Sequence, residues 1–139
     1  MKIKTVYTYG VWDLLHVGHL RLLQEAKALG DKLIVCVFTD AVATSFKRTP
    51  IISQDHRLEM IQALHFVDEV VLQGELIPDI NLKRYRPDIL AKGPGANWEK
   101  GKKPPGFGVM KEIGGKVVFL DYHDIISTTH IIEKCKERK

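Results

Sequence analysis

Residues 4–19 read KTVYTYGVWDLLHVGH, and this stretch decides the fold of the chain. Its first part, residues 4–9, is rich in β-branched and aromatic residues, which predicts a strand. Residues 10–13 then resemble a turn. Apolar residues follow at helical spacing, at Leu20, Leu22, Leu23, Ala26 and Leu29. This periodicity predicts a helix that begins close to two histidines.

The two histidines, His16 and His19, are three residues apart with Gly18 between them. At a helix N-terminus the backbone N–H groups lack partners, and the helix dipole favours an anion. Residues three apart share a helix face, so both imidazoles can point at one ligand. Gly18 lets that ligand approach the backbone closely. The pattern therefore favours phosphate binding.

Two other interpretations of the histidine pair stay open. His-x-x-His can supply half of a zinc or copper site, but such a site needs further ligands at recognisable spacing. Cys36 and Cys135 stand alone in apolar surroundings, so we assign no metal ligands. A histidine can also be a solvent-exposed or hydrogen-bonded structural residue.

Length and composition are those of one soluble globular domain over residues 1–139, with 45% hydrophobic and 27% charged residues. No apolar run reaches the roughly 18 residues of a membrane span, and no signal-peptide core is present. We expect a cytoplasmic protein with no membrane partner. The net charge of +4 lies mostly in residues 100–103 and 134–139, without the aromatic-rich motif of a nucleic-acid binder. We therefore expect no nucleic-acid partner.

Short apolar strands alternate with helical patterns along the chain. Four further strands are predicted, at residues 33–38, 67–72, 88–91 and 116–120. Helices are predicted at residues 55–64, 79–84 and 109–113, and from about Ser127 onward. Residues 39–53 are predicted to be a polar stretch without a helix, and residues 93–108 a loop. This alternation predicts an α/β fold with a parallel five-stranded sheet and helices on both faces.

In such sheets, ligands bind at the carboxyl ends of the strands. The polar residues at these ends are His16, His19, Lys47, Lys92, Ser127, Thr128 and Thr129. Ser127 alone is explained as an N-cap, but three consecutive hydroxyls exceed what capping needs. Together with free N–H groups they predict a second phosphate site. Two such helix starts would suit a nucleoside triphosphate, and no P-loop motif is present.

Residues 8–19 and the segment Ile126-Ser127-Thr128-Thr129 resemble the cytidylyltransferase-like nucleotidyltransferases, which carry an HxGH and an ISTT-type motif on a small Rossmann-like fold. The resemblance covers essentially the whole chain. Residues 29–31 and 56–57 are similar to glycerol-3-phosphate and ethanolamine-phosphate cytidylyltransferases. Lys92-Gly93 and residues 114–118 are similar to the adenylyltransferase domain acting on heptose 1-phosphate.

The resemblance implies an enzyme that transfers CMP or AMP from CTP or ATP to a small phosphate monoester. The acceptor would be a glycerol phosphate, an amino-alcohol phosphate or a sugar phosphate. Its phosphate would attack the α-phosphorus and expel pyrophosphate with no covalent enzyme intermediate. The resemblance also implies Mg²⁺ accompanying the triphosphate, and a homodimer.

Roles for individual residues follow from the same resemblance. The catalytic residues would be His16, His19 and Lys47. The nucleotide would be bound by these histidines together with Gly10, Val11, Trp12, Gly18, Lys92, Ser127, Thr128 and Thr129. The acceptor would be bound by Asp13, Lys47, Arg57 and Trp98. For Arg57, a surface ion pair with Asp55 or Glu59 is an equally reasonable alternative.

The nucleotide stays undecided at this point. Glycerol-phosphate-type enzymes have Arg-Thr-x-Gly where this chain has Tyr122-His123-Asp124-Ile125, and heptose-type enzymes also lack that arginine, which favours ATP. Asn97-Trp98-Glu99 instead resembles the Asp-Trp-Glu segment of the cytidylyltransferases. The missing arginine and glycine also leave open a nucleotide-binding module that has lost turnover.

Overall fold

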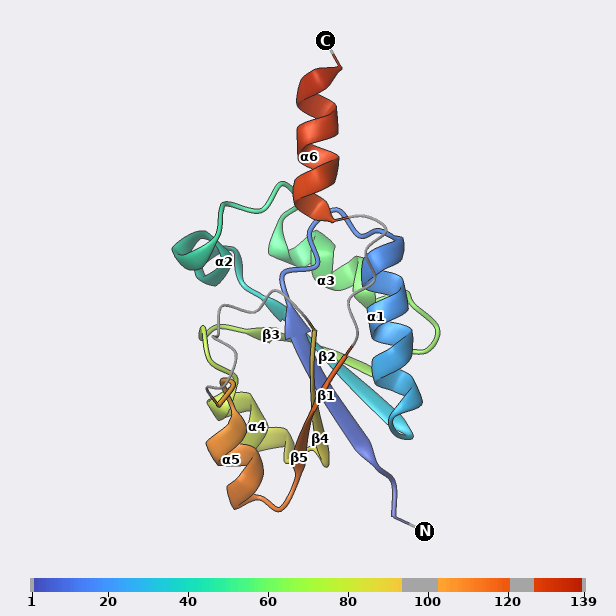
Figure 1. The fold of residues 1–139 in the computed structure, drawn as a ribbon, viewed down its shortest axis with the longest axis vertical. Coiled ribbons are helices and arrows are strands. Elements are labelled where there is room, and N and C mark those ends of the chain that lie inside the picture. Colours follow the sequence, from blue (N-terminus) through green and yellow to red (C-terminus); the bar gives the residue numbers. More distant parts are fainter. Residues whose placement is uncertain (1, 94–102, 121–126, 139) are drawn as a thin grey trace.

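A single parallel sheet forms the centre of the computed structural model, which describes residues 2–93, 103–120 and 127–138. Its strands lie in the order β3-β2-β1-β4-β5, and each neighbouring pair is parallel (Figure 1). They are β1 (Thr5–Gly10), β2 (Lys32–Phe38), β3 (Glu69–Gln73), β4 (Ile89–Lys92) and β5 (Lys116–Phe119). The predicted five-stranded parallel sheet is confirmed.

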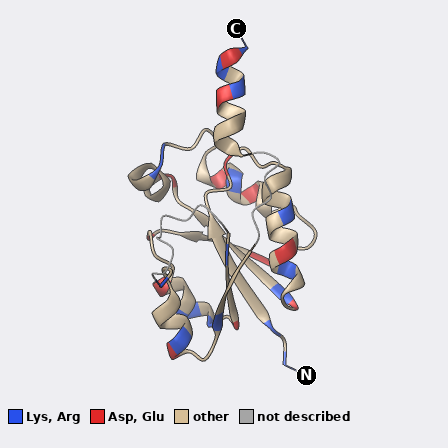
Figure 2. Cartoon of the chain, viewed as in Figure 1, with Lys and Arg blue, Asp and Glu red and all other residues tan. Residues whose placement is uncertain are grey.

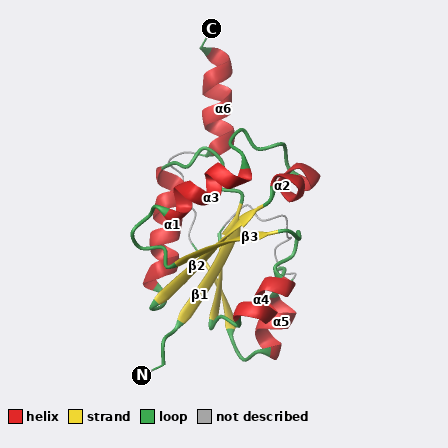
Figure 3. Ribbon diagram, turned by 180° about the vertical axis from the view of Figure 1, so that it is seen from behind, coloured by secondary structure: helices red, strands yellow, loops and turns green. Residues whose placement is uncertain are grey.

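Helices cover both faces of this sheet, as predicted (Figure 3). One face carries α1 (Val17–Ala28) and α3 (Gln54–Gln62), and the other carries α4 (Asp79–Tyr85) and α5 (Phe107–Glu112). Successive strand residues point to opposite faces, so each strand contributes to two apolar cores. In β1, Val6 packs with the α1 side and Tyr7 with the α4 side.

Two further helices stand at the carboxyl end of the sheet. The first, α2 (Asp40–Phe46), falls within the polar stretch that was predicted to contain no helix, so that prediction is wrong. Thr39 caps it by accepting the N–H of Val42 at 3.2 Å, and Pro50 lies beyond its end and cannot interrupt it.

The second, α6 (Thr128–Glu137), projects away from the sheet and carries charged side chains of both signs (Figure 2). Cys135 is exposed on it, which corrects the expected apolar surroundings, whereas Cys36 is fully buried in β2. None of the helices in the described part of the chain is long and apolar enough to cross a membrane.

Arg57 on α3 ties together the loops at this end of the sheet. Its side chain is fully buried, and its guanidinium donates to the backbone carbonyls of Val11 at 2.6 Å, Phe38 at 2.9 Å and Ile52 at 2.8 Å. It also donates to the carboxylate of Asp40 at 2.7 Å. The planar fork of arginine suits several acceptors at once. One side chain therefore joins the segments that follow β1 and β2 to the segment that precedes α3.

This role replaces both expectations for Arg57. No ion pair with Asp55 or Glu59 is found among the described residues; the carboxylate partner is Asp40. The guanidinium is also occupied by the protein itself, so the structure gives it a scaffold role rather than contact with an acceptor.

We expect Arg57→Met to lower the free energy of unfolding by about 3–5 kcal/mol, because buried carbonyls and a carboxylate lose their partner. Urea unfolding monitored by circular dichroism measures this. Arg84→Met, at an exposed position on α4, is the matched control and should stay within about 0.5 kcal/mol of the parent protein. Equal stabilities of the two variants would contradict the scaffold role.

Candidate functional site

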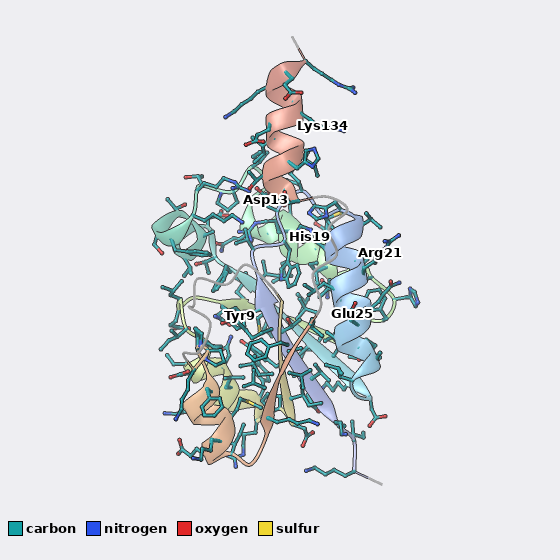
Figure 4. The ribbon with its side chains drawn as sticks, in the orientation of Figure 1. Tyr9, Asp13, His19, Arg21, Glu25 and Lys134 are labelled. Atoms are coloured by element: carbon teal, nitrogen blue, oxygen red, sulfur yellow. The ribbon has the colours of Figure 1, made fainter. Side chains whose placement is uncertain are left out.

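A cavity of about 230 Å³ opens at the carboxyl ends of β1, β2 and β4. The predicted site residues that line it are Gly10, Val11, Trp12, Asp13, His19, Lys47, Lys92 and Thr128. The predicted site residues that do not line it are His16, Gly18, Arg57, Ser127 and Thr129, and Trp98 lies outside the described residues. Tyr9 and His19 both lie at this end of β1 (Figure 4). The structure therefore brings side chains from three strand ends and two helix starts to one place.

The two histidines form a capping box at the N-terminus of α1. His16 is the N-cap, and its Nδ1 accepts the backbone N–H groups of Gly18 at 3.0 Å and His19 at 3.4 Å. In return, the N–H of His16 donates to Nδ1 of His19 at 3.3 Å. The two rings stack, with centroids 3.8 Å apart. The expected free N–H groups of Gly18 and His19 are thus already occupied, because the first imidazole takes the place foreseen for phosphate.

The same contacts determine which ring nitrogens can meet a ligand. Because both Nδ1 atoms accept hydrogen bonds, each neutral ring carries its proton on Nε2. Nε2 of His16 is buried and has no hydrogen-bond partner within the described residues. A buried donor without an acceptor is costly unless a ligand satisfies it. The unpartnered donor at this helix start is therefore an imidazole N–H of His16, whereas the backbone N–H groups of Gly18 and His19 are occupied.

Burial keeps both imidazoles neutral. It lowers the pKa of His19 to about 3, with repulsion from His16 and from Lys47 adding to the effect. Burial also lowers the pKa of His16. A nearby anion favours the charged form and would raise both values. The pair can therefore donate hydrogen bonds while neutral and gain charge as negative charge accumulates beside it.

The side chain of Trp12 lines the cavity and is fixed in place by several contacts. It has a positive φ of 56°, and its indole N–H donates to the carbonyl of Cys36 at 2.9 Å. A Cβ at Gly10 would lie 3.0 Å from the indole ring, so glycine at this position leaves room for it. The ring also meets His19 edge-on, with centroids 5.5 Å apart.

Asp13, expected to bind the acceptor, instead anchors two loops. Its carboxylate accepts the backbone N–H groups of Ile51 at 2.8 Å and Ile52 at 2.9 Å. Its carbonyl accepts the hydroxyl of Thr128 at 2.7 Å. Both carboxylate oxygens therefore have protein partners, which leaves Asp13 a positioning role at the edge of the cavity.

The three hydroxyls at the start of α6 also have protein partners. Ser127 is confirmed as the N-cap and accepts the N–H of His130 at 3.0 Å. Thr128 is buried against Asp13, and Thr129 accepts a hydrogen bond from Arg48 at 3.2 Å. Thr128 and Thr129 thus connect the start of α6 to Asp13 and Arg48, and Ser127 caps the helix; the second phosphate site stays a prediction.

Sequence reasoning did not single out several cavity residues, among them Thr8, Tyr9, Phe38, Phe46 and Arg48. Tyr9 is the important omission, because its hydroxyl accepts a hydrogen bond from Lys92 at 2.7 Å. Lys92 is only 6% exposed, and burial lowers its pKa to about 8. The signal that could have found Tyr9 is the side-chain alternation of β1 and β4, which places both residues on one face.

Lys47 lies at the rim of the cavity, where burial and the charge of Arg48 lower its pKa. Over the described ranges, no group of three or more His, Cys, Asp or Glu is arranged to hold a metal ion. The cations and N–H donors here suit an anion.

The depressed pKa of His19 makes stability depend on pH. The folded value of about 3 lies below the ordinary value of 6.5, so its contribution is complete above pH 6.5 and is lost as pH falls toward 3. We expect the free energy of unfolding to fall between pH 6.5 and 4.5, by up to about 1.4 kcal/mol per pH unit from His19. His19→Gln, which cannot titrate, should flatten this slope in urea titrations. Parallel curves for the two proteins would contradict the assignment.

The hydroxyl of Thr128 offers a second test of the site's construction. Thr128→Val leaves the buried carbonyl of Asp13 without its donor, so we expect a loss of about 1–3 kcal/mol in unfolding free energy and weaker nucleotide binding. Thr128→Ser keeps the hydroxyl and is the control. Thermal unfolding and nucleotide titration measure both effects, and indistinguishable variants would show that the contact has no energetic importance.

Comparison with known proteins identifies the family of this chain. The cytidylyltransferase-like family model matches residues 7–134. The bifunctional protein HldE of Pseudomonas aeruginosa strain LESB58 is 40% identical over 137 residues, which are 97% of this chain and 28% of that protein. HldE of Campylobacter concisus is 39% identical over 140 residues, again 28% of its length. The chain thus spans just over a quarter of these relatives.

Solved structures agree as well. The lipopolysaccharide core biosynthesis protein from Thermoplasma volcanium has a TM-score of 0.78 and 30% identity, and the match covers 88% of this chain and all of that one. A protein from Archaeoglobus fulgidus with a TM-score of 0.64 and 18% identity shares the fold. With the family model spanning nearly its whole length, the chain belongs to the cytidylyltransferase-like family of nucleotidyltransferases.

Proposed function

We propose that this protein transfers AMP from ATP to the phosphate of a sugar phosphate and releases pyrophosphate. The observation that carries the proposal is the stacked pair His16 and His19 at the mouth of α1, with the Nε2 of His16 buried and unpartnered in the described part of the chain. A phosphate oxygen is the acceptor that would satisfy such a donor.

The reaction is a direct displacement. An oxygen of the acceptor phosphate attacks the α-phosphorus of the triphosphate and forms a new P–O bond. The bond from that phosphorus to the oxygen bridging the α- and β-phosphates breaks, and pyrophosphate leaves with the electron pair. Such chemistry needs positioning and charge neutralisation rather than a covalent enzyme intermediate.

The chain's own groups supply that neutralisation. His16 and His19 donate to the α-phosphate and bridging oxygens, and their pKa values rise as charge develops there. Lys47 at the cavity rim neutralises phosphate charge from the β2 side. Gly10, Val11 and Trp12 line the cavity where the nucleotide would lie.

Three observations favour ATP and a sugar phosphate over CTP and an alcohol phosphate. Lys92-Gly93 and residues 114–118 resemble the adenylyltransferase domain acting on heptose 1-phosphate. The relatives named HldE are about 40% identical, and the structural relative carries lipopolysaccharide core biosynthesis in its name. The cytidylyltransferase-type arginine before Ser127 is replaced by Tyr122.

Mg²⁺ fits this proposal as a companion of the nucleotide. The carboxylate of Asp13 is occupied by backbone N–H groups, and the described residues offer no cluster of metal ligands. The ion would be held mainly by phosphate oxygens, where it neutralises charge on the triphosphate. We also propose a homodimer, as relatives of this size commonly form, which sedimentation can test.

Nucleotide choice can be measured first by thermal unfolding with Mg²⁺ and each of ATP, CTP, GTP and UTP. A ligand at one hundred times its dissociation constant adds about 2.7 kcal/mol to stability. We expect a shift selective for ATP, followed by pyrophosphate release when α-D-glucose 1-phosphate or another sugar 1-phosphate is added. A shift selective for CTP would redirect the proposal to polyol phosphates, and binding without pyrophosphate release from any acceptor would indicate a module without turnover.

Loss of either histidine should lower turnover by roughly 10²–10⁴-fold, the range for removing one preorganised donor or acid. His16→Ala and His19→Ala are compared with His56→Ala, which alters an exposed residue on α3. Pyrophosphate release is the readout, after circular dichroism has verified folding. Turnover at the parent rate in either variant would remove the histidines from the mechanism.

A further inference from the structure

Lys92 is a buried cation at the cavity with no use in the reaction described so far. It ends β4, and its ammonium lies 2.7 Å from the hydroxyl of Tyr9 and 4.3 Å from the centre of that ring. No carboxylate lies within ion-pair distance of it among residues 2–93, 103–120 and 127–138. A buried ammonium normally requires a negative partner. Here an incoming anion can provide it.

Strand geometry separates this cation from the histidine pair. In β1, Tyr7 faces the α4 side, and Tyr9, two residues on, packs against the same core. In β4, Leu90 faces that core too, which places Lys92 on the same side. Trp12 and Leu22, which line the cavity near His19, pack with the α1 side. One cavity is therefore lined by His19 on the α1 side and by Lys92 on the α4 side, with the end of β1 between them.

A reaction that joins two phosphates requires a separate set of binding groups for each phosphate. The attacking phosphate and the α-phosphate carry like charges and must come within bonding distance, so each requires its own positive or hydrogen-bonding group. In-line displacement also requires the attacking oxygen to arrive opposite the leaving pyrophosphate. Arg48 donates to Thr129 on α6, and Lys47 at the rim keeps more of its surface exposed than Lys92 does, so Lys92 is the enclosed cation among the described residues that line the cavity.

We propose that Lys92, held against Tyr9, binds the phosphate of the acceptor substrate across the end of β1 from the histidine pair. This inference rests on the proposed function. It assigns Lys92 to the acceptor, whereas the sequence resemblance implied that Lys92 binds the nucleotide. Tyr9 positions the ammonium through its hydroxyl and ring, and its neighbours Phe38 and Phe46 form an aromatic wall beside it, with successive ring centroids 5.4 Å apart.

Burial makes this site responsive to its ligand. It lowers the pKa of Lys92 to about 8, so Lys92 is mostly an ammonium at pH 7 and loses its charge as the pH rises through 8. A bound phosphate favours the charged form. Tyr9 stays protonated, because burial and the charge of Asp79 raise its pKa, and it remains a hydroxyl partner throughout.

The test compares Lys92→Met, which keeps the length and removes the charge, with Tyr9→Phe, which keeps the charge. The triphosphate site is first filled with the α,β-methylene analogue of ATP, and inorganic phosphate or α-D-glucose 1-phosphate is then titrated calorimetrically. We expect Lys92→Met to bind the analogue within twofold of the parent protein and to lose tenfold or more in affinity for both phosphates. Tyr9→Phe should lose about threefold or less.

The outcomes separate this inference from the proposed function. Unchanged phosphate affinity in Lys92→Met, or no phosphate binding by the nucleotide-loaded parent, overturns the inference and leaves nucleotidyl transfer standing. Weaker analogue binding with normal phosphate binding would return Lys92 to the nucleotide. If the parent binds no nucleotide, the proposed function fails, and phosphate binding that depends on Lys92 would still support the subsite. If Lys92→Met does not fold, the ¹³Cε signal of Lys92 in the labelled parent must shift on phosphate addition, and no shift overturns the inference.

Discussion

The buried guanidinium of Arg57 is the interaction on which the site depends. The carboxyl ends of parallel strands lie at one edge of the sheet, and the loops that leave this edge are not held by strand hydrogen bonds. Arg57 holds them instead by donating to the carbonyls of Val11, Phe38 and Ile52. Asp13 adds to this by accepting the N–H groups of Ile51 and Ile52. A cavity built from loops can keep its shape only when such buried polar groups satisfy one another.

In the histidine pair, the local sequence determines where the rings lie, and the folded structure determines which of their nitrogens are free. The position of the two histidines in the sequence places both rings at the start of α1, where the helix dipole favours an anion. In the folded chain each ring accepts a backbone N–H of the other's segment, and their stacking and burial keep both neutral. The helix start is therefore capped without a ligand, and the imidazole N–H groups become the donors. In the proposed reaction, this pair would meet phosphate as neutral hydrogen-bond donors and gain charge only as phosphate binds.

The cavity also has two different sides, which follow from the geometry of the sheet. Because side chains alternate along β1 and β4, the histidines belong to the α1 side, and Tyr9 with Lys92 belongs to the α4 side. A reaction that joins two phosphates would use both sides. The family model and the relatives support nucleotide chemistry, and we propose that the second side is where this chain distinguishes one acceptor from another.

The sequence by itself determined the sheet, its parallel order of strands and helices, and the meeting of His19, Lys47, Lys92 and Thr128 at one edge, because hydrophobic periodicity and strand ends are local features. It missed α2, because a helix of seven residues is too short to give a clear periodic signal. It did not reveal that Arg57, Asp13 and the hydroxyls of Thr128 and Thr129 bond to other parts of the protein. Whether a polar group faces a ligand or another loop depends on which distant carbonyls and N–H groups are left unsatisfied, and only the tertiary structure decides that.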